Sequence, residues 1–370
     1  MKILYVLEYF YPHIGGVETL FQSLTKKVSE EGHSITVITN KYSKELSSLE
    51  IIDGVKIKRY PFGNRYLFTL LAIFPVIREA LRHDIIHTTS YNAGFPSYFA
   101  GYITRTKVII TFHEVWSQLW DGVPFMGSIS RFLHRSFEAM LLKLPFTKFV
   151  AVSDSTKNAL VAAGVKETRV IRIYNGLDYE DFPSSERKAV IDDTFNFCYF
   201  GRLGVSKGID VLMEAVLKLK DSRQEAYTLT LIIPKEENAI LSYVFKLIEE
   251  YNLNSIIKIK HELSRENLFQ ELVKADAIII PSYNEGFGFT AAETSALGIP
   301  IISSGKGSLP EVVSGKHIEF TPYSGDGLAE SMKQAMNGDW QHDVPLKKFN
   351  LDESVNNYID LYHDLHTRVK

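Results

Sequence analysis

Short apolar runs alternate with longer segments of helical period through the first half of the chain. The apolar runs occupy residues 2–7, 34–39, 84–89, 107–112 and 148–153, and segments with apolar residues on one helical face follow at 16–32, 94–104 and 154–164. Apolar strands without polar alternation, each leading toward a helix, are typical of a parallel sheet covered on both faces. This half is therefore predicted to be a doubly wound α/β domain.

The same pattern restarts after a polar stretch at 179–194, which has no periodicity and which we interpret as a linker. Predicted strands then lie at 195–201, 227–234, 256–260, 276–282 and 300–304, with helical segments at 208–220, 240–253, 265–275, 290–298 and 308–315. The second half thus repeats the architecture of the first. The final segment, 352–370, places its apolar residues on one face of a helix.

Composition agrees with two folded domains. The chain has 370 residues, of which 45% are apolar and 23% are charged, which is ordinary for a folded protein of two lobes. A net charge of -3 gives no reason to expect a nucleic-acid partner. The one cysteine, Cys198, cannot form an internal disulfide and is expected to be a small buried side chain, and no His/Cys cluster has metal-ligand spacing, so a reducing cytoplasm fits best.

The apolar segments are not those of a secreted or membrane-spanning chain. The first residues are expected to form a buried strand instead of a signal peptide, because they contain one basic residue and no small-residue cleavage site. The longest apolar run, 66–77, is too short to span a bilayer and contains Pro75. We expect no transmembrane segment.

Two glycine-containing loops follow predicted strands, where open α/β sheets bind their ligands. Gly15 and Gly16 lie between the first strand and its helix, where free amides and the helix dipole favour an anion. Arg202 and Lys207 bracket the loop GRLGVSKG, which would hold two cations near a diphosphate. The structural alternative for Gly15 and Gly16 is a plain strand-to-helix turn. For the loop with Arg202 and Lys207 the alternative is a solvated loop.

Acidic and histidine side chains follow two other predicted strands. His113 comes directly after 107–112 and could bind a hydroxyl or carry a proton, although a lone histidine is more often structural. Glu285 and Glu293 follow 276–282, and carboxylates accept hydrogen bonds from sugar or ribose hydroxyls. Glu293 also fits a capping box with Thr290, which is its structural alternative. Together these loops describe a nucleotide-sugar pocket.

The segment EGFGFTAAE, followed by ALGIPIISSGKGSLPEVV, resembles the signature of glycosyltransferase family four, the retaining enzymes of GT-B fold. The resemblance covers nearly the whole chain in order, through GGVE, TFHE, AVSDSTKNAL, NGLD and GRLGVSKG. It implies two Rossmann-like domains facing across a cleft. The N-terminal acceptor domain would comprise 1–179 and the returning helix 352–370, and the C-terminal donor domain would comprise 180–351.

The resemblance also implies roles for particular residues. Arg202 and Lys207 would bind the donor diphosphate in place of a metal ion, assisted by the backbone of Gly16, so neither a metal nor a cofactor is expected. Glu293 would hold the ribose, and Glu285 would hold the transferred sugar. The other implied donor contacts are the amides of Phe287, Gly288, Phe289 and Thr290, with His113 contacting the sugar from the N-terminal domain.

The implied activity is retaining transfer of a hexose from a UDP- or GDP-sugar to a hydroxyl acceptor, such as a glycan, a lipid-linked sugar or a small polar molecule in cell-envelope or polysaccharide synthesis. In front-face transfer a diphosphate oxygen takes the acceptor proton, so His113, Glu285, Arg202 and Lys207 are the expected catalytic residues. Two alternatives remain, a nucleotide-sugar epimerase of GT-B architecture and an inactive nucleotide-sugar-binding homologue. A dehydrogenase is disfavoured because the glycine fingerprint is missing.

Two features bear on donor and acceptor. The segment PKEEN at 234–238 and the residues His261 and Glu262 replace glycines that are usual in the family, which leaves UDP and GDP both open. Aromatic and basic residues mingle at 65–82 and 128–148. Relatives acting on lipid-linked acceptors often touch membranes with such helices. Two interpretations therefore stay open, namely peripheral contact with an anionic membrane at its cytoplasmic face and ordinary amphipathic helices packed on the sheet.

Overall fold

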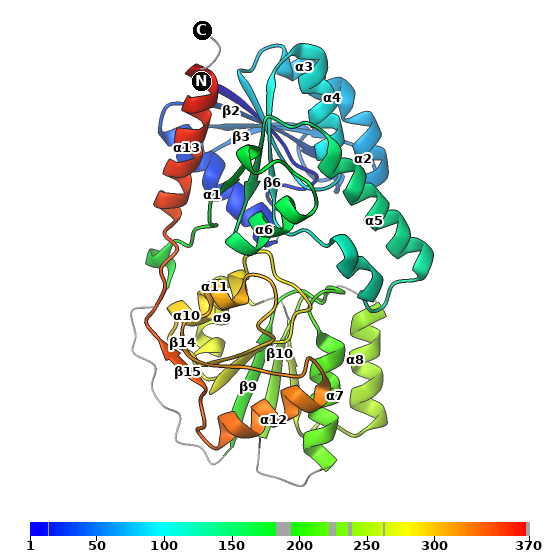
Figure 1. The fold of residues 1–370 in the computed structure, drawn as a ribbon, viewed down its shortest axis with the longest axis vertical. Coiled ribbons are helices and arrows are strands. Elements are labelled where there is room, and N and C mark those ends of the chain that lie inside the picture. Colours follow the sequence, from blue (N-terminus) through cyan, green and yellow to red (C-terminus); the bar gives the residue numbers. More distant parts are fainter. Residues whose placement is uncertain (14, 183–193, 222–226, 236–238, 262, 368–370) are drawn as a thin grey trace. The chain divides into compact units, whose positions relative to one another are not determined.

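The computed structural model describes residues 1–370 except 14, 183–193, 222–226, 236–238, 262 and 368–370 (Figure 1). The chain forms two compact units. The N-terminal unit comprises Met1–Trp120, Phe132–Gly176 and Asn350–Lys370, and the C-terminal unit comprises Asp121–Arg131 and Leu177–Phe349. Most of the linker predicted from sequence lies outside the described residues.

The domain limits differ from the prediction at one internal segment and by two or three residues at the boundaries. Residues 121–131, which the sequence prediction places in the N-terminal domain, group with the C-terminal unit. The ring of Phe125 lies 5.4 Å from the ring of Tyr243 in that unit. The chain passes between the units at 176/177 and 349/350, where the prediction has 179/180 and 351/352.

The sheet of the N-terminal unit has eight strands in the order β3-β4-β2-β1-β5-β6-β7-β8. They are β1 (Lys2–Val6), β2 (Ser34–Asn40), β3 (Leu49–Ile52), β4 (Val55–Tyr60), β5 (Ile85–Thr89), β6 (Lys107–Phe112), β7 (Lys148–Ala151) and β8 (Val170–Arg172). All neighbours pair in parallel except β3 and β4, which form a hairpin. This hairpin is absent from the sequence prediction, and its turn is Asp53-Gly54 with φ values of 50° and 76°.

Helices cover both faces of this sheet, which explains its uninterrupted apolar strands. Leu4 and Val6 of β1 join the core beneath α2 (Arg65–Leu71), α3 (Ile73–Ala80), α4 (Gly94–Thr104), α5 (Ser128–Lys143) and α6 (Asp154–Ala162). Tyr5, between them in the strand, points to the other face, where its ring meets Phe21 of α1 (Gly16–Glu30). Alternate residues of one strand therefore enter two different cores.

The last helix, α13 (Leu351–Thr367), packs on the N-terminal unit beside α1 (Figure 1). The Tyr362 hydroxyl lies 2.7 Å from both the Tyr5 hydroxyl and Nδ1 of His87. Burial lowers the pKa of His87 to about 3, so the ring is neutral. A buried, hydrogen-bonded aromatic cluster thus fixes the end of the chain to the first sheet.

The C-terminal unit repeats the architecture with a seven-stranded sheet in the order β11-β10-β9-β12-β13-β14-β15. Its strands are β9 (Phe195–Phe200), β10 (Tyr227–Ile232), β11 (Ile257–Lys260), β12 (Ala277–Ile280), β13 (Ile301–Ser303), β14 (Gly315–Glu319) and β15 (His342–Val344). Among the strands that the structure describes in this unit, only β15 is antiparallel to its neighbour. Its helices are α7 (Ile209–Asp221), α8 (Ala239–Glu250), α9 (Arg265–Leu272), α10 (Phe289–Ala296), α11 (Leu309–Val312) and α12 (Gly325–Met336).

Each parallel sheet reverses its strand order once. In the C-terminal unit the reversal lies between β9 and β12, and in the N-terminal unit it lies between β1 and β5. Loops that leave neighbouring strands in opposite directions open a crevice beyond the carboxyl ends of those strands, where doubly wound sheets bind ligands. Binding sites are therefore expected at these two crevices.

Candidate functional site

Two loops separated by many residues in sequence meet at the crevice of the C-terminal unit. Gly208 ends the loop after β9 in a left-handed conformation with φ of 65°, and a Cβ there would lie 1.8 Å from the carbonyl oxygen of Pro281. The amide of Tyr283 donates to the carbonyl oxygen of Ser206 at 2.8 Å. Only glycine permits this close approach, so Gly208 fixes the loop 201–208 against the loop 281–288.

The contact between the loops is completed by a charged pair. Nζ of Lys207 donates to Oε1 of Glu285 at 2.8 Å, and the Ser282 hydroxyl donates to the same oxygen at 2.7 Å. Glu285 is 9% exposed. Sequence reasoning predicted both charged residues but neither their contact nor the part of Ser282, because the pairing depends on which strands are neighbours in the sheet.

The backbone around Glu285 is held from a second side. A Cβ on Gly307 would lie 2.2 Å from the Glu285 carbonyl oxygen, and the amide of Ser308 donates to that oxygen at 3.0 Å. The chain after β13 therefore holds the backbone of Glu285 in place. This rigid support is what a binding group requires to keep its geometry.

Arg202 is exposed at the rim of the same crevice. Its carbonyl oxygen accepts a hydrogen bond from the buried Tyr199 hydroxyl at 3.1 Å. Burial, with a smaller contribution from the nearby Glu285 carboxylate, raises the pKa of Tyr199. Tyr199 therefore stays a neutral hydrogen-bond donor that positions the loop, while the guanidinium of Arg202 is accessible to a ligand.

The start of α10 forms another wall of the crevice. Its N-cap is Gly288, with φ of 83° and ψ of 61°, and no side chain caps the helix. The capping box of Thr290 and Glu293, the structural alternative for Glu293, is therefore not formed, because α10 begins at Phe289 and Thr290 already lies inside its first turn. A helix of this kind presents its first amides to a ligand, and the dipole favours negative charge there.

Glu293 lies one turn further along α10, with its side chain 18% exposed. Burial raises the pKa of its carboxyl to about 6, and the Arg265 guanidinium, 4.0 Å away, acts in the opposite direction. Arg265 in turn lies over the ring of Phe269. Glu293 is thus a largely ionised but poorly solvated acceptor at neutral pH, and its interaction with Arg265 was not anticipated from the sequence.

Gly16 and His113 belong to the N-terminal unit. Gly16 is the first residue of α1, after an N-cap, Gly15, that has no side chain. His113 follows β6, and burial lowers its pKa to about 4. Its Nε2 is buried without a hydrogen-bond partner among the described residues. An imidazole that is neutral and has an unsatisfied nitrogen is suited to hydrogen-bond a ligand hydroxyl.

The crevice of the N-terminal unit also contains residues that sequence reasoning missed. Glu8 follows β1 and Asn92 lies in the loop after β5, and Nδ2 of Asn92 donates to Oε2 of Glu8 at 2.6 Å. Nε of Arg65 lies 3.4 Å from the other oxygen of Glu8. The sequence did contain a signal that Glu8 lies at the crevice, because it is the first polar residue after an apolar strand.

The geometry separates the predicted residues into two groups. His113 and Gly16 lie in the N-terminal unit, and the others surround the crevice of the C-terminal unit: Arg202, Lys207, Glu285, Phe287, Gly288, Phe289, Thr290 and Glu293. The second group combines two cations, a helix start without a side-chain cap, and two carboxylates, one in the loop before α10 and one within α10. Such a set can hold an anionic diphosphate together with hydroxyl-bearing rings. The fold and this site define a GT-B glycosyltransferase.

Comparison with protein families supports the same class. The family described as Glycosyltransferase Family 4 matches residues 14–181, and Glycosyl transferases group 1 matches residues 181–349. The chain belongs to the glycosyltransferases of the family-four type.

Individual relatives are distant. The GPI3 subunit of phosphatidylinositol N-acetylglucosaminyltransferase from Saccharomyces cerevisiae is 23% identical over 91% of this chain and 74% of the relative. Sucrose-phosphate synthase from Thermosynechococcus elongatus has a similar structure, with 17% identity, a TM-score of 0.79 and full coverage of both chains. Anabaena HepE in complex with UDP-glucose is 16% identical with a TM-score of 0.71, over 98% of this chain and 100% of that chain.

Proposed function

We propose that the protein is a retaining hexosyltransferase that moves a sugar from a UDP- or GDP-linked donor to the hydroxyl of a lipid-borne acceptor at an anionic membrane surface. The observation that carries the donor half of this proposal is the junction of Lys207 with Glu285 at the strand-order reversal of the C-terminal sheet. The class of donor is supported by the UDP-glucose complex of the structurally similar HepE.

Without a ligand, the charges of Lys207 and Glu285 already neutralise each other. Lys207 contacts Glu285, while Arg202 lies exposed at the rim. A diphosphate would lie between the two cations, and Lys207 would then bridge the diphosphate and the Glu285 carboxylate. Glu285 would accept hydrogen bonds from the transferred sugar, and Glu293, beyond the first turn of α10, would accept them from the ribose.

The chemical step in this proposal is a substitution on one face of the sugar. The bond from the anomeric carbon to the diphosphate oxygen breaks, and a bond to the acceptor oxygen forms on the same side. The acceptor proton passes to the departing diphosphate oxygen. Negative charge grows on the diphosphate, so the fixed cations Arg202 and Lys207 would stabilise the transition state more than the ground state. His113 would contact a sugar hydroxyl as a neutral imidazole.

A donor screen tests this half of the proposal. The purified protein is incubated with UDP- and GDP-linked sugars and a lipid-borne hydroxyl acceptor, and the released nucleotide and the anomeric configuration of the product are measured. We expect one donor class to be consumed with retention by the wild type and by Lys246→Ala, an exposed lysine of α8, but not by Lys207→Ala. An isomerised donor without transfer would instead identify an epimerase.

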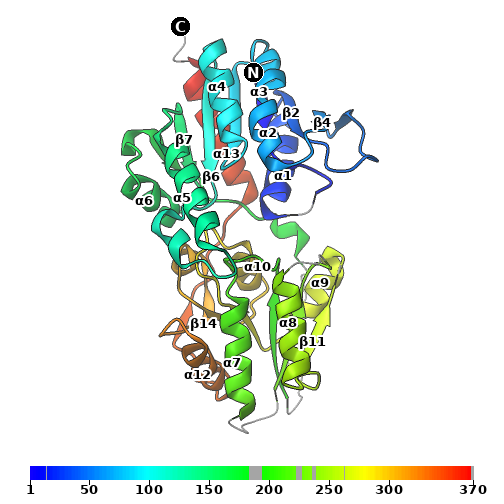
Figure 2. The same ribbon diagram turned by 90° about the vertical axis from the view of Figure 1, so that its right-hand side faces the viewer.

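The acceptor half rests on one face of the N-terminal unit. Helices α2, α3 and α4 pack side by side, and α5 joins them through a 5.0 Å ring contact between Phe95 and Phe137 (Figure 2). Large apolar side chains project outward from these four helices and are 42–74% exposed: Tyr66, Leu67, Leu70, Leu71, Phe74, Leu81, Phe99, Tyr102, Ile103, Phe132, Leu133 and Met140. We call these residues the α2–α5 face.

The charges on these helices favour an anionic partner. The acidic residues within α2–α5, Glu79 and Glu138, are 5% and 1% exposed and are hydrogen-bonded internally. The exposed charged residues within these helices are basic and include Arg78, Arg135 and Lys143, whereas Arg82 and the exposed Asp84 follow α3. Exposed apolar residues beside basic residues, without exposed acids, are typical of helices that lie in a membrane interface. Within the described residues no helix is long and apolar enough to span a bilayer.

Sedimentation with vesicles tests this surface. The wild type should sediment with vesicles that contain anionic lipid and less with zwitterionic ones, and added salt should release it. The variant Leu70→Ser/Phe74→Ser should stay in the supernatant, whereas Phe245→Ser, an exposed aromatic residue of the C-terminal unit, should behave as the wild type. A wild-type protein that remains in the supernatant at low salt would refute the membrane half while leaving the donor half untouched.

A further inference from the structure

A second cavity lies in the C-terminal unit, away from the donor residues. Its volume is about 530 Å³. Four of the lining residues start or precede the adjacent strands β9, β12, β13 and β14, namely Phe195, Asp276, Pro300 and Gly315. The donor loops leave the opposite ends of β9 and β12. Because a strand rises about 3.3 Å per residue, the six residues of β9 separate the two sites by the depth of the sheet.

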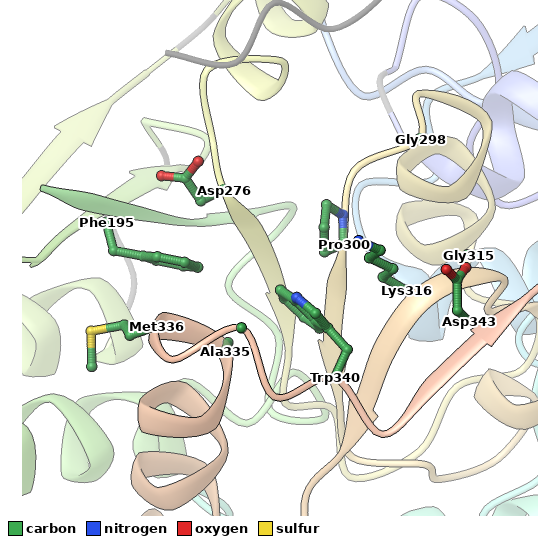
Figure 3. Close-up of a pocket in the computed structure, with 11 residues that line it drawn as sticks. Phe195, Asp276, Gly298, Pro300, Gly315, Lys316, Ala335, Met336, Trp340 and Asp343 are labelled. Carbon is green, nitrogen blue, oxygen red and sulfur yellow. The ribbon is translucent and has the colours of Figure 1, made fainter. Parts of the chain in front are cut away.

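An indole ring stands in this cavity. Figure 3 shows Trp340 reaching into the middle of the lining group from the chain after α12, with Phe195 and Asp276 on one side and Lys316 and Asp343 on the other. Trp340 is half-buried and packs against the core at the edge of the cavity. The indole is therefore held in place while part of it stays available to a ligand.

Polar groups flank the aromatic ones. Lys316 and Asp343 are opposite each other across the antiparallel pair of β14 and β15, so their side chains share one face. Asp276 accepts a hydrogen bond from the amide of Asn196 at 2.8 Å, which fixes its carboxylate at the other end of the cavity. The cavity thus offers acceptors at both ends and one ammonium donor.

Three glycines line the cavity. Gly298, Gly315 and Gly338 have positive φ values of 66°, 74° and 80°, and an added Cβ at any of them would meet no atom within 4 Å. These glycines contribute no side chain to the lining of the cavity. The volume lies within the range of small-molecule sites.

We infer that this cavity is a second carbohydrate site, which binds one or two sugar rings of a glycan without catalysing a reaction. The apolar C–H face of a pyranose would cover the Trp340 indole, and its hydroxyls would donate to Asp276 and Asp343 and accept from Lys316. Two carboxylates disfavour a phosphate-bearing ligand, since they would repel its charge. The site requires no nucleotide, so it stands apart from the proposed transfer reaction.

Fluorine NMR on protein labelled with 5-fluorotryptophan tests the inference. The chain has three tryptophans, of which Trp116 and Trp120 lie in the N-terminal unit, and Trp340→Phe assigns the third signal. Titration with maltotriose, chitobiose or mannobiose should shift the Trp340 signal saturably and leave the other two in place. The shift should persist in Lys207→Ala, which disables the proposed donor site.

Matched variants localise the effect. Asp343 is exposed, so Asp343→Ala should fold normally and weaken sugar binding by about tenfold, the effect of losing one charge-assisted hydrogen bond. Glu330→Ala, an exposed glutamate of α12 outside the cavity, should leave the affinity unchanged. The inference is wrong if no sugar shifts the Trp340 signal, or if benzyltrimethylammonium shifts it and the sugars do not, which would indicate a cation site.

Discussion

Replacing Glu293 by Gln should stabilise the C-terminal unit while weakening donor binding. Burial raises the pKa of Glu293 from 4.5 to about 6, so the folded state holds this proton more tightly than the unfolded state. At 1.36 kcal/mol per pKa unit, keeping the ionised carboxylate buried destabilises the folded state by about 2 kcal/mol. A neutral amide of similar shape does not carry this penalty.

The size of the stabilisation depends on pH. Well below pH 4.5 the carboxyl is protonated in both states, so Gln and Glu should be equivalent. As pH rises through about 6 the wild type becomes progressively less stable than Glu293→Gln. The full difference should appear at about pH 8 and correspond to roughly 4 to 8 °C in the melting temperature of a unit of this size.

Calorimetric unfolding at about pH 8 and about pH 4 measures this difference directly. The control is Glu330→Gln, since Glu330 is exposed on α12 of the same unit and should show no such pH-dependent gain. Titration with UDP and GDP sugars should show weaker binding by about tenfold in Glu293→Gln, from the loss of one charged acceptor. A variant that is no more stable than the wild type at high pH, or equally stabilised at both pH values, would refute the reasoning.

Three further predictions concern transfer activity. Arg202→Ala should lower turnover by about 10²-fold without loss of stability, because its side chain is exposed. Lys207→Ala should also destabilise the fold by about 1 to 3 kcal/mol, because it leaves the buried Glu285 carboxylate without its cationic partner. Equal denaturation midpoints for the two variants would contradict this. His113→Ala should lower turnover, and His113→Asn should partly restore it. In the wild type, a plot of turnover against pH should show no inflection from His113 until the pH falls toward about 4, where its imidazole protonates. If Arg202 and Lys207 supply the positive charge that a metal ion would otherwise provide, chelation by EDTA should leave the initial rate of transfer unchanged. A rate that EDTA abolishes and that only added Mg²⁺ or Mn²⁺ restores would contradict that mechanism.

The doubly wound fold was predictable because its strands are buried on both faces and therefore appear as continuous apolar runs. The hairpin of β3 and β4 was not predicted, since β3 is a half-exposed edge strand in which Leu49 and Ile51 face solvent. Its Asp53-Gly54 turn was nevertheless a readable hairpin signal, because this dipeptide readily adopts the required positive φ values.

The residue types of the site were predictable, but their contacts were not. Lys207 and Glu285 are 78 residues apart and meet because β9 and β12 are neighbours, although β10 and β11 intervene in the sequence. Local sequence patterns do not specify that order of strands. The capping box failed for a related reason, since the left-handed Gly288 starts α10 before Thr290 and overrides the local motif.

A crystal structure with a bound UDP- or GDP-sugar tests the central claim most directly. The account predicts that the diphosphate lies against the Arg202 guanidinium and the Lys207 ammonium, with the ribose hydroxyls at Glu293 and the sugar at Glu285. A donor bound at any position remote from both cations would contradict it.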